Sequence, residues 1–472
     1  MDRTGPPGPR VGVNLVGYLE SSLGVGQVAR QLWRALQARG VPVAPVSIKA
    51  RRAPELEAPL RGLVDPADAS FPVNLLCVNA EGVEGAVDLL GRDFFEGRTS
   101  VGMWWWETAD FPDRWLRAFD GLDELWAGSH FVAAALAEVS PVPVVPVPTP
   151  VSVAPARAGH GLDLPDGFRF LAMCDYGSGL ARKNPLGTID AFRRAFAGQR
   201  DVQLVVKSAG ASEHPDARAR VEQAAAAVDN VTVVDTVLSG PAKDALIAAC
   251  GCFVSLHRSE GFGLPLAEAM LLGRPVVATA YGGALDFLDQ WNSYLVDFGI
   301  AAIGPGNDPY PADGAWAEPD IDHAAQQLRW VFEHREEARV RAERGRVDVA
   351  RDHSHAAAGA AMATRLARLA TLPSGRDGRV DRLVTEELER RMRAQPPLPA
   401  PEVSLPRVRA LARSVVLRAT EMQSAHRRLV DEELLAVLRT LDERVEGLAA
   451  AQATLQGQIE ELERRGRRSN GL

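Results

Sequence analysis

Short apolar runs of strand length alternate along this chain with longer segments of helical periodicity. In the first third, the strand-like apolar runs occupy residues 11–18, 41–48, 74–80, 101–106, 124–129 and 142–148. Segments such as 28–40 and 131–139 lie between them and repeat apolar residues at helical spacing. This alternation predicts a parallel, doubly wound sheet covered by helices, which is an α/β architecture.

The same rhythm restarts after a turn-rich segment at 148–167, which is typical of a linker. The strand-like runs that follow are 168–176, 202–208, 231–237, 252–257, 275–280 and 293–298. We therefore expect two Rossmann-like domains that face a cleft, one at 1–155 and one at 156–372. Ligands bind beyond the carboxyl ends of the strands in such sheets, so each domain should form one wall of the site.

Beyond residue 372 the pattern changes. We expect a helical and proline-rich linker at 373–407 and a coiled-coil tail at 408–472. Apolar positions in the tail repeat in alternating steps of four and three, with one polar member. These positions are Leu434, Leu438, Leu441, Val445, Leu448, Gln452, Leu455, Ile459 and Leu462. A single amphipathic surface helix would give the same pattern, so that interpretation stays open beside the favoured coiled coil.

Composition and charge are those of an ordinary globular protein. The 472 residues include 53 basic and 61 acidic side chains, for a formal net charge of −8. This acidic balance argues against a nucleic-acid partner. The N-terminal stretch is polar and turn-rich, unlike a signal peptide, and no apolar run reaches the roughly 18–20 residues that span a bilayer. We expect a cytoplasmic protein, with peripheral membrane contact left open.

The four cysteines, Cys77, Cys174, Cys250 and Cys252, all lie in apolar contexts. The Cys250-Gly-Cys252 pair could form half of a metal site, but no second Cys/His pair answers it. Small buried thiols in a reducing compartment are the favoured interpretation, and we predict no metal site.

The segment HRSEGFGLPLAEAM, His257–Met270, carries the strongest chemical signal. It follows an apolar strand and enters a predicted helix at 264–272, whose first turn suits Pro265. A helix N-terminus offers free N–H groups and partial positive charge to a phosphate. Carboxylates repel phosphate, so Glu260 and Glu268 should instead accept hydrogen bonds from sugar hydroxyls. Together these features predict a nucleotide-sugar pocket; the alternative is a capped helix with surface acids.

The stretch EGFGLPLAEAM resembles the Glu-x7-Glu motif of the retaining glycosyltransferases of family 4, which have the GT-B fold. That resemblance implies that Glu268 holds the ribose hydroxyls of the nucleotide and that Glu260 contacts hydroxyls of the transferred sugar. It also implies that backbone N–H groups of the intervening loop touch the sugar or diphosphate. The loop residues concerned are Gly261, Phe262, Gly263 and Leu264. The resemblance extends through residues 273–283 and 314–322.

A pair of cations follows the first strand of the second domain, within residues 176–196. Arg182 offers a planar fork and Lys183 a point charge to anionic oxygens. The resemblance implies that Lys183 neutralises the diphosphate leaving group. Many relatives carry an arginine several residues earlier, where this chain has DYGSG, so either Arg182 replaces it or it is absent. Lys207 is a weaker candidate, and a solvated basic pair is the alternative for Arg182 and Lys183.

In the first domain, a glycine-bearing loop joins the first strand to a helix within residues 17–36. Gly24 and Gly26 would let this loop approach the donor phosphate or the acceptor, although a lone G-x-G is a weak signal. The three tryptophans at 104–106 favour buried packing over an aromatic platform for an acceptor sugar. Glu107, directly after them, could orient the acceptor hydroxyl or act as a base.

Two further polar groups stand at predicted helix starts. Ser129 and His130 end a strand on the cleft side, and His130 is interpreted first as a helix-start residue. The Asp-x-Asp at Asp320 and Asp322 resembles a metal motif of another glycosyltransferase fold. It precedes a helical segment, however, so helix capping is the favoured interpretation.

The resemblance implies transfer of a hexose from a nucleoside diphosphate sugar to a hydroxyl of a glycan or glycolipid. It implies retention of configuration, no metal, and no cofactor besides the donor substrate. Surface polysaccharide assembly is the setting that such relatives suggest. Two alternatives stay open: a sugar-nucleotide epimerase, and a non-catalytic scaffold whose coiled coil recruits partners. The tail would serve homo-oligomerisation or docking to a partner protein.

Deletion of residues 400–472 tests the prediction for the tail. A coiled coil that joins copies of the chain should give a lower mass in solution once it is removed, whereas donor hydrolysis should be unchanged. Light scattering on the full-length and truncated proteins measures this mass. An unchanged mass would contradict the oligomerisation hypothesis.

Overall fold

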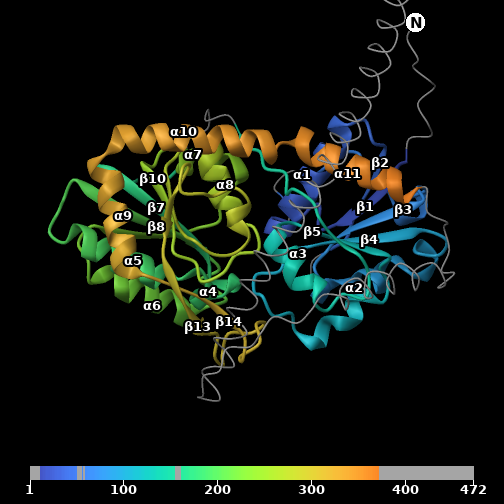
Figure 1. Cartoon of the computed structure of the whole chain (residues 1–472), viewed down its shortest axis with the longest axis horizontal. Coiled ribbons are helices and arrows are strands. Elements are labelled where there is room, and N and C mark those ends of the chain that lie inside the picture. The colour runs from blue at the N-terminus through green and yellow to red at the C-terminus, as the bar shows by residue number, and fades with distance from the viewer. Residues whose placement is uncertain (1–10, 50–55, 57–58, 155–160, 371–472) are drawn as a thin grey trace, which may run out of the picture. The chain divides into compact units, whose positions relative to one another are not determined.

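The computed structural model describes residues 11–49, 56, 59–154 and 161–370, which all belong to one compact unit, Met1–Pro396. The predicted linker at 373–407 and coiled-coil tail at 408–472 lie outside the described residues. Within the described residues, two parallel six-stranded sheets and one two-stranded sheet are formed. We call residues 11–154 together with 355–370 the first lobe and residues 161–354 the second lobe (Figure 1).

The first lobe is built on a parallel sheet of order β2-β1-β3-β4-β5-β6. Its strands are β1 Val13–Gly17, β2 Val43–Ser47, β3 Val73–Cys77, β4 Thr99–Trp104, β5 Glu124–Ala127 and β6 Val144–Pro146. Its helices are α1 Gly24–Ala38, α2 Ala80–Leu90, α3 His130–Ala137 and the 3-10 segments η1 Pro66–Asp68, η2 Arg92–Phe94 and η3 Asp113–Phe119. Strands β1, β3 and β5 are buried along their whole length, because helices cover both faces of a parallel sheet.

The second lobe repeats the plan with a sheet of order β12-β11-β10-β7-β8-β9. Its strands are β7 Phe168–Asp175, β8 Val202–Ala209, β9 Val231–Asp235, β10 Cys252–Ser255, β11 Val276–Thr279 and β12 Tyr294–Val296. Its helices are α4 Leu180–Lys183, α5 Pro185–Phe196, α6 Pro215–Ala226, α7 Gly240–Ala248, α8 Leu264–Leu271, α9 Ile321–Glu333 and α10 Arg335–Asp352, with 3-10 segments η4 Tyr176–Ser178 and η5 Gly283–Asp286. The two doubly wound sheets confirm the predicted α/β class.

One predicted strand is divided in the structure. The apolar run at 293–298 forms β12, which joins the parallel sheet, and then begins β13 Phe298–Ala302. Strand β13 pairs with β14 Ala315–Pro319 in an antiparallel hairpin, with Ile300 opposite Ala317. We call residues 303–314, which connect the two strands, the hairpin connection. Apolar periodicity alone could not separate β12 from β13, because the two strands follow each other with only Asp297 between them.

The last described helix returns to the first lobe. Helix α11, His355–Leu369, packs against α1, and its buried Ala358, Met362 and Leu366 complete the core of that lobe (Figure 1). Residues 355–369, although within the predicted second domain of 156–372, therefore pack on the first lobe. The two lobes also meet at the backbone, where the Val151 N–H donates to the His353 carbonyl at 2.8 Å.

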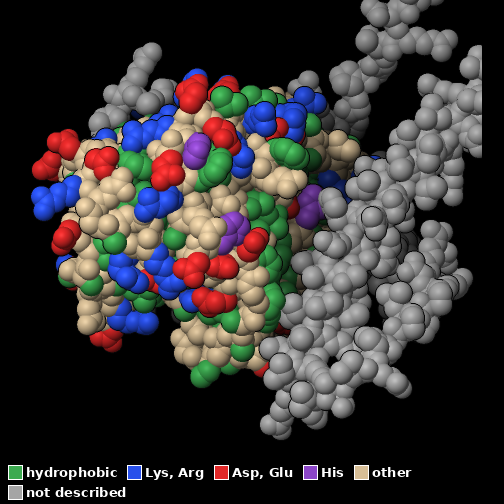
Figure 2. All heavy atoms as spheres, turned by 60° about the vertical axis from the view of Figure 1, so that its left-hand side comes forward, with side chains coloured by type: hydrophobic (Ala, Val, Ile, Leu, Met, Phe, Trp, Pro, Cys, Tyr) green, Lys and Arg blue, Asp and Glu red, His purple; other side chains and the backbone are tan. Residues whose placement is uncertain are grey.

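Charged side chains of both signs are interspersed over the described residues of the face shown in Figure 2. On the exposed face of helix α10, Glu336 pairs with Arg339 and Glu343 with Arg346, one turn apart. Such surface pairs contribute little to stability, so they indicate a solvated face. Among the described residues, no helix has both the length and the apolar character needed to cross a membrane.

A partly buried ion pair fastens α11 to the first sheet. Glu124, at the start of β5, is 2% exposed and accepts hydrogen bonds from Arg365 on both oxygens and from Trp126 Nε1 at 2.6 Å. Removing one partner of a buried pair leaves an uncompensated charge. The contact therefore makes the first lobe depend on a helix more than two hundred residues later in the chain.

Arg365→Met should lower the free energy of unfolding by roughly 2–4 kcal/mol, because Glu124 would lose its cation inside the sheet. Urea unfolding followed by tryptophan fluorescence measures the change, since Trp126 lies in the same cluster. Arg339→Met, which removes an exposed pair on α10, is the matched control and should change little. Equal effects of the two substitutions would contradict the assignment.

Candidate active site

Helix α8 begins at the carboxyl edge of the second sheet, beyond strand β10. Gly263 is its N-cap with φ of 87°, a left-handed conformation that favours glycine, and Pro265 lies in the first turn as predicted. The helix ends at Leu271, close to the predicted range of 264–272. We call residues 256–263, between β10 and α8, the acid loop. Its position places the N-terminus of α8, with the positive end of the helix dipole, beyond the strand ends.

Glu260 in the acid loop is 7% exposed and is held by two cations. Lys183 Nζ donates to its Oε1, and Arg182 Nη1 lies 3.3 Å from its Oε2. Burial by itself would raise the pKa of Glu260, but Lys183 and then Arg182 outweigh burial and lower it to about 2. Glu260 is therefore a carboxylate throughout the physiological pH range.

Arg182 and Lys183 end the short helix α4 but differ in exposure. Arg182 is 4% exposed and donates to the Ser178 carbonyl at 3.1 Å and the Ser259 carbonyl at 3.0 Å. Lys183 keeps 17% of its side chain exposed. The structure therefore places Arg182 beneath the acid loop, where it supports Glu260. Of the two, Lys183 is the more accessible to a bound anion.

The turn after Lys183 is fixed by Asn184. Its φ of 50° is left-handed, and its side-chain oxygen caps α5 by accepting from Gly187 N at 3.1 Å. The amide nitrogen of the same side chain donates to the Leu256 carbonyl in the acid loop at 3.0 Å. The cation pair and the acid loop are thereby joined through buried hydrogen bonds.

Glu268, one turn into α8, is 1% exposed. Its Oε1 accepts from Lys243 Nζ of α7 and from Gln27 Nε2 of α1, the latter at 2.7 Å. Its Oε2 is buried and has no hydrogen-bond partner among the described residues. Burial raises the pKa of Glu268, and Lys243 opposes that effect. An unsatisfied buried carboxylate oxygen is costly, and a hydroxyl donor from a ligand would satisfy it.

The glycine loop of the first lobe is the first turn of α1. Gly24 begins the helix, and open space surrounds the point where a Cβ would sit. Gly26 is needed for packing, because a Cβ there would lie 2.9 Å from the Ser21 carbonyl oxygen. Gln27 in the same turn makes the contact with Glu268. The segment was predicted to approach the cleft through its glycines, but the contact is made by the side chain of Gln27, which the sequence did not point to.

The acid loop also touches the first lobe directly. Ser129 Oγ donates to the Gly261 carbonyl at 2.6 Å, and Ser259 Oγ donates to the Glu107 carbonyl. A Cβ on Gly261 would lie 2.8 Å from the Trp106 carbonyl oxygen. Gly261 is therefore required by the contact between the lobes, whereas the sequence suggested only close approach of a ligand.

The three tryptophans pack into the protein. Trp104 is buried against Phe119 with ring centroids 4.9 Å apart, Trp105 Nε1 donates to Thr149 Oγ1 at 3.0 Å, and Trp106 Nε1 donates to the Asp110 carbonyl at 2.9 Å. Their structural role agrees with the favoured interpretation. Glu107, which follows them, is partly exposed and accepts from the Tyr310 hydroxyl at 3.2 Å.

Residues 174–302 match the family Glycosyl transferases group 1. The matched segment contains the two cations, the acid loop and Glu268. The sequence has no significant match among curated proteins.

Solved structures confirm the two-domain GT-B fold. Sucrose-phosphate synthase from Thermosynechococcus elongatus is 19% identical with a TM-score of 0.55, and the match covers 76% of this chain and 99% of that one. A glycosyltransferase from Rickettsia africae ESF-5 is 13% identical with a TM-score of 0.55, covering 77% and 100%. Anabaena HepE in complex with UDP and glucose is 14% identical with a TM-score of 0.51, covering 76% and 100%. At these identities the likeness shows the fold alone.

Other predicted site residues also fall within the matched segment. Lys207 on β8 is 8% exposed, and burial lowers its pKa, although Asp175 opposes that effect. Phe262 packs its ring on Phe287 and His353, so that only its backbone is available to a ligand. Leu264 is the first residue of α8.

The remaining polar candidates have structural partners. His130 starts α3 as predicted, and its backbone N–H donates to Asp286 Oδ2 of the second lobe at 2.9 Å. Asp320 caps α9 by accepting from Asp322 N and His323 N, which agrees with the capping interpretation. Among the described residues, no group of three or more His, Cys, Asp and Glu side chains is arranged to hold a metal ion. Cys250 and Cys252 are buried, and burial raises the pKa of both thiols.

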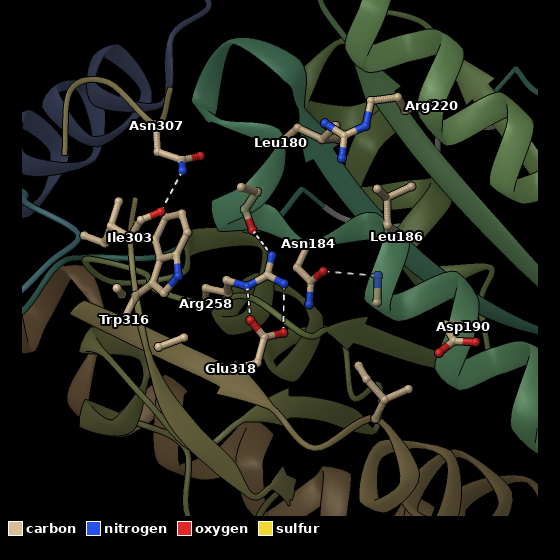
Figure 3. A pocket seen from close by; sticks show the side chains of 15 residues that line it. Leu180, Asn184, Leu186, Asp190, Arg220, Arg258, Ile303, Asn307, Trp316 and Glu318 are labelled. Carbon is tan, nitrogen blue, oxygen red and sulfur yellow. Dashed lines mark hydrogen bonds and ion pairs between the residues drawn. The ribbon is translucent and has the colours of Figure 1, made fainter. Parts of the chain in front are cut away.

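A hollow of about 530 Å³ lies between α4, α5 and the β13–β14 hairpin (Figure 3). Arg258 crosses it, bonded to Glu318 through two nitrogens at 2.7 and 2.8 Å and to the Ala181 carbonyl at 2.6 Å. None of Lys183, Glu260 and Glu268 lines this hollow. We therefore assign Arg258 a structural role, in which it joins the hairpin to α4 and the acid loop.

The lowered pKa of Glu260 predicts how stability depends on pH. A carboxyl whose pKa falls on folding stabilises the folded state above its ordinary value of 4.5, and this contribution is lost as the pH falls toward 2. The shift corresponds to about 3 kcal/mol. Thermal unfolding from pH 7 to pH 2 should therefore show a steeper loss of stability below pH 4.5 in the wild type than in Glu260→Gln.

The exposed Glu222→Gln, on α6 and paired with Arg218, is the matched control and should keep the wild-type slope. Parallel slopes for wild type and Glu260→Gln would mean that Glu260 is not held as a carboxylate by its two cations.

Proposed function

We propose that this protein transfers a hexose from a nucleoside diphosphate sugar to a hydroxyl of a glycan or glycolipid acceptor. The proposed transfer proceeds with retention of configuration and without a metal. The observation that carries the proposal is the paired arrangement around α8. Glu260, in the acid loop before α8, accepts a hydrogen bond from Lys183. Glu268 lies one turn into α8, and its buried Oε2 has no hydrogen-bond partner among the described residues. The match of residues 174–302 to group 1 glycosyltransferases supports it.

Each group has a role set by its charge. Glu268 Oε2 would accept a hydrogen bond from a ribose hydroxyl, which satisfies the buried oxygen. The diphosphate would lie toward the N-terminus of α8, where N–H groups and the helix dipole favour an anion. Lys183 would move from Glu260 to the diphosphate, freeing the Glu260 carboxylate to accept from a hydroxyl of the sugar.

The barrier to such a reaction is departure of an anionic diphosphate from an oxocarbenium-like centre. Lys183 and the α8 N-terminus act where that negative charge develops. The bond from the anomeric carbon to the diphosphate oxygen breaks, and a bond to the acceptor oxygen forms on the same face. The acceptor proton passes to the released diphosphate. This route uses no carboxylate nucleophile, unlike retaining hydrolases, which need two carboxyl groups about 5 Å apart.

Calorimetry of donor binding tests the proposal. We expect one of the UDP-, GDP-, ADP- or dTDP-sugars to bind, with UDP-sugars tried first because the HepE complex contains UDP. Glu268→Gln should weaken binding about 10- to 100-fold, because an amide accepts the ribose hydroxyl less strongly than a carboxylate. Glu222→Gln is the matched surface control and should bind as the wild type does.

Failure of every nucleotide sugar to bind the wild type would contradict the proposal and favour the scaffold interpretation. Equal donor affinity of wild type and Glu268→Gln would instead contradict the role given to Glu268.

A further inference from the structure

The segment Trp106–Glu107 of the first lobe is held on one side by the acid loop. It is separated by one residue from the end of β4, at the carboxyl edge of the first sheet. The Glu107 carbonyl accepts from the fully buried Ser259, next to Glu260. The backbone of Gly261 lies so close to Trp106 that a Cβ would be 2.8 Å from its carbonyl oxygen. The backbone that carries the Glu107 side chain is therefore fixed relative to Glu260.

On its other side the same segment meets Tyr310, from the hairpin connection of the second lobe. The Tyr310 ring packs on Trp106 with centroids 5.3 Å apart, and its hydroxyl donates to Glu107 Oε2 at 3.2 Å. Tyr310 is 8% exposed, and burial raises the pKa of its phenol, so it remains a proton donor. The Glu107 carboxylate therefore accepts a hydrogen bond from an uncharged group, the Tyr310 hydroxyl, of the second lobe.

Arg182 joins this contact to the donor side of the site. Its guanidinium lies 5.9 Å from the centre of the Tyr310 ring, and the same guanidinium reaches Ser259 and Glu260. Glu107 and Glu260, one from each lobe, are therefore placed around a single buried cation. No protein donor to Glu107 Oε1 is found among the described residues, and the side chain is only partly buried.

We infer that Glu107 is the first-lobe group that receives a hydrogen bond from the attacking acceptor hydroxyl, and that Tyr310 is the positioning residue that aims its carboxylate. The inference rests on the proposed function and adds an acceptor-side pair to it. Oε2 is held by Tyr310, and Oε1 accepts from the acceptor O–H. The acceptor oxygen then bonds to the anomeric carbon as the diphosphate leaves, and its proton goes to the diphosphate. Glu107 orients the hydroxyl and remains a carboxylate.

Slow transfer of the sugar to water provides the assay, because water is the smallest hydroxyl that can occupy the acceptor position. The donor is the nucleotide sugar identified by calorimetry, and release of its nucleoside diphosphate is measured. Tyr310→Phe keeps the ring on Trp106 but removes the hydroxyl. We expect Glu107→Gln and Tyr310→Phe each to lower kcat about 10-fold with KM for the donor unchanged. The double variant should be no slower than the slower single one, because both act through one carboxylate.

Arg114→Gln is the matched control. Arg114 is a first-lobe residue that bonds the same hairpin connection, at Asp308 and the Pro309 carbonyl. Its side chain is half exposed and that of Asp308 is largely exposed, and among the described residues the Glu107 carboxylate is bonded to Tyr310 and not to Arg114. This variant should keep the wild-type kcat and KM. A merely structural role for Tyr310 would affect both parameters, or would be imitated by Arg114→Gln.

Several results would overturn the inference. One is a wild-type kcat in Tyr310→Phe; another is a raised donor KM with unchanged kcat, which would place Tyr310 at the donor. A third is a wild type that binds its donor yet never transfers the sugar to water. If no donor binds at all, the proposed function itself fails. The role given to Glu107 then fails with it, and thermal unfolding of the two single variants and the double variant tests only the Glu107–Tyr310 contact, since additive effects would show that the two residues are not coupled.

Discussion

The burial of Glu260 between Lys183 and Arg182 constrains most of the surrounding structure. A carboxylate taken out of water is strongly unfavourable unless cations and hydrogen bonds replace the lost hydration. Here the two cations come from the short helix α4, which follows β7, whereas the acid comes from the acid loop after β10. The two strands are neighbours in the sheet, so the pairing needs only local loops to converge. Asn184 and Arg258 reinforce that convergence through backbone carbonyls.

The contact between the lobes follows from the same loop. Ser259 and Gly261, on either side of Glu260, both contact backbone carbonyl groups or hydroxyls of the first lobe. Anything that displaces the first lobe must therefore disturb the backbone around the buried acid. The arrangement couples the geometry around Glu260 to the backbone of the first lobe at Glu107 and Ser129.

Much of this arrangement could be predicted from the sequence, because it depends on residues that are close together along the chain. The alternation of apolar runs predicted the two sheets, and the acids, glycines and proline of 260–268 predicted a helix start at a strand end.

The residues that complete the site could not be predicted in this way. Gln27 lies 241 positions from Glu268 along the chain, and Tyr310 lies 203 positions from Glu107. A lone glutamine, a lysine in α7 or a tyrosine in a hairpin connection carries no local signal, and only the topology brings each to its partner. The packing of α11 on the first lobe could not be predicted for the same reason. An amphipathic pattern predicts that a helix packs against a core, but not which lobe supplies that core.

That return has a consequence for how the protein is made. Residues Ala358, Met362 and Leu366 belong to the core around α1, and Arg365 neutralises an acid inside the first sheet. During synthesis the N-terminal lobe emerges first, yet its core stays open on the α1 face until residue 369 has left the ribosome. The second lobe can close its own sheet before that point. The second lobe can therefore complete its core before the first lobe does, although the first lobe is synthesised earlier. The apolar face of α1 stays exposed until α11 covers it.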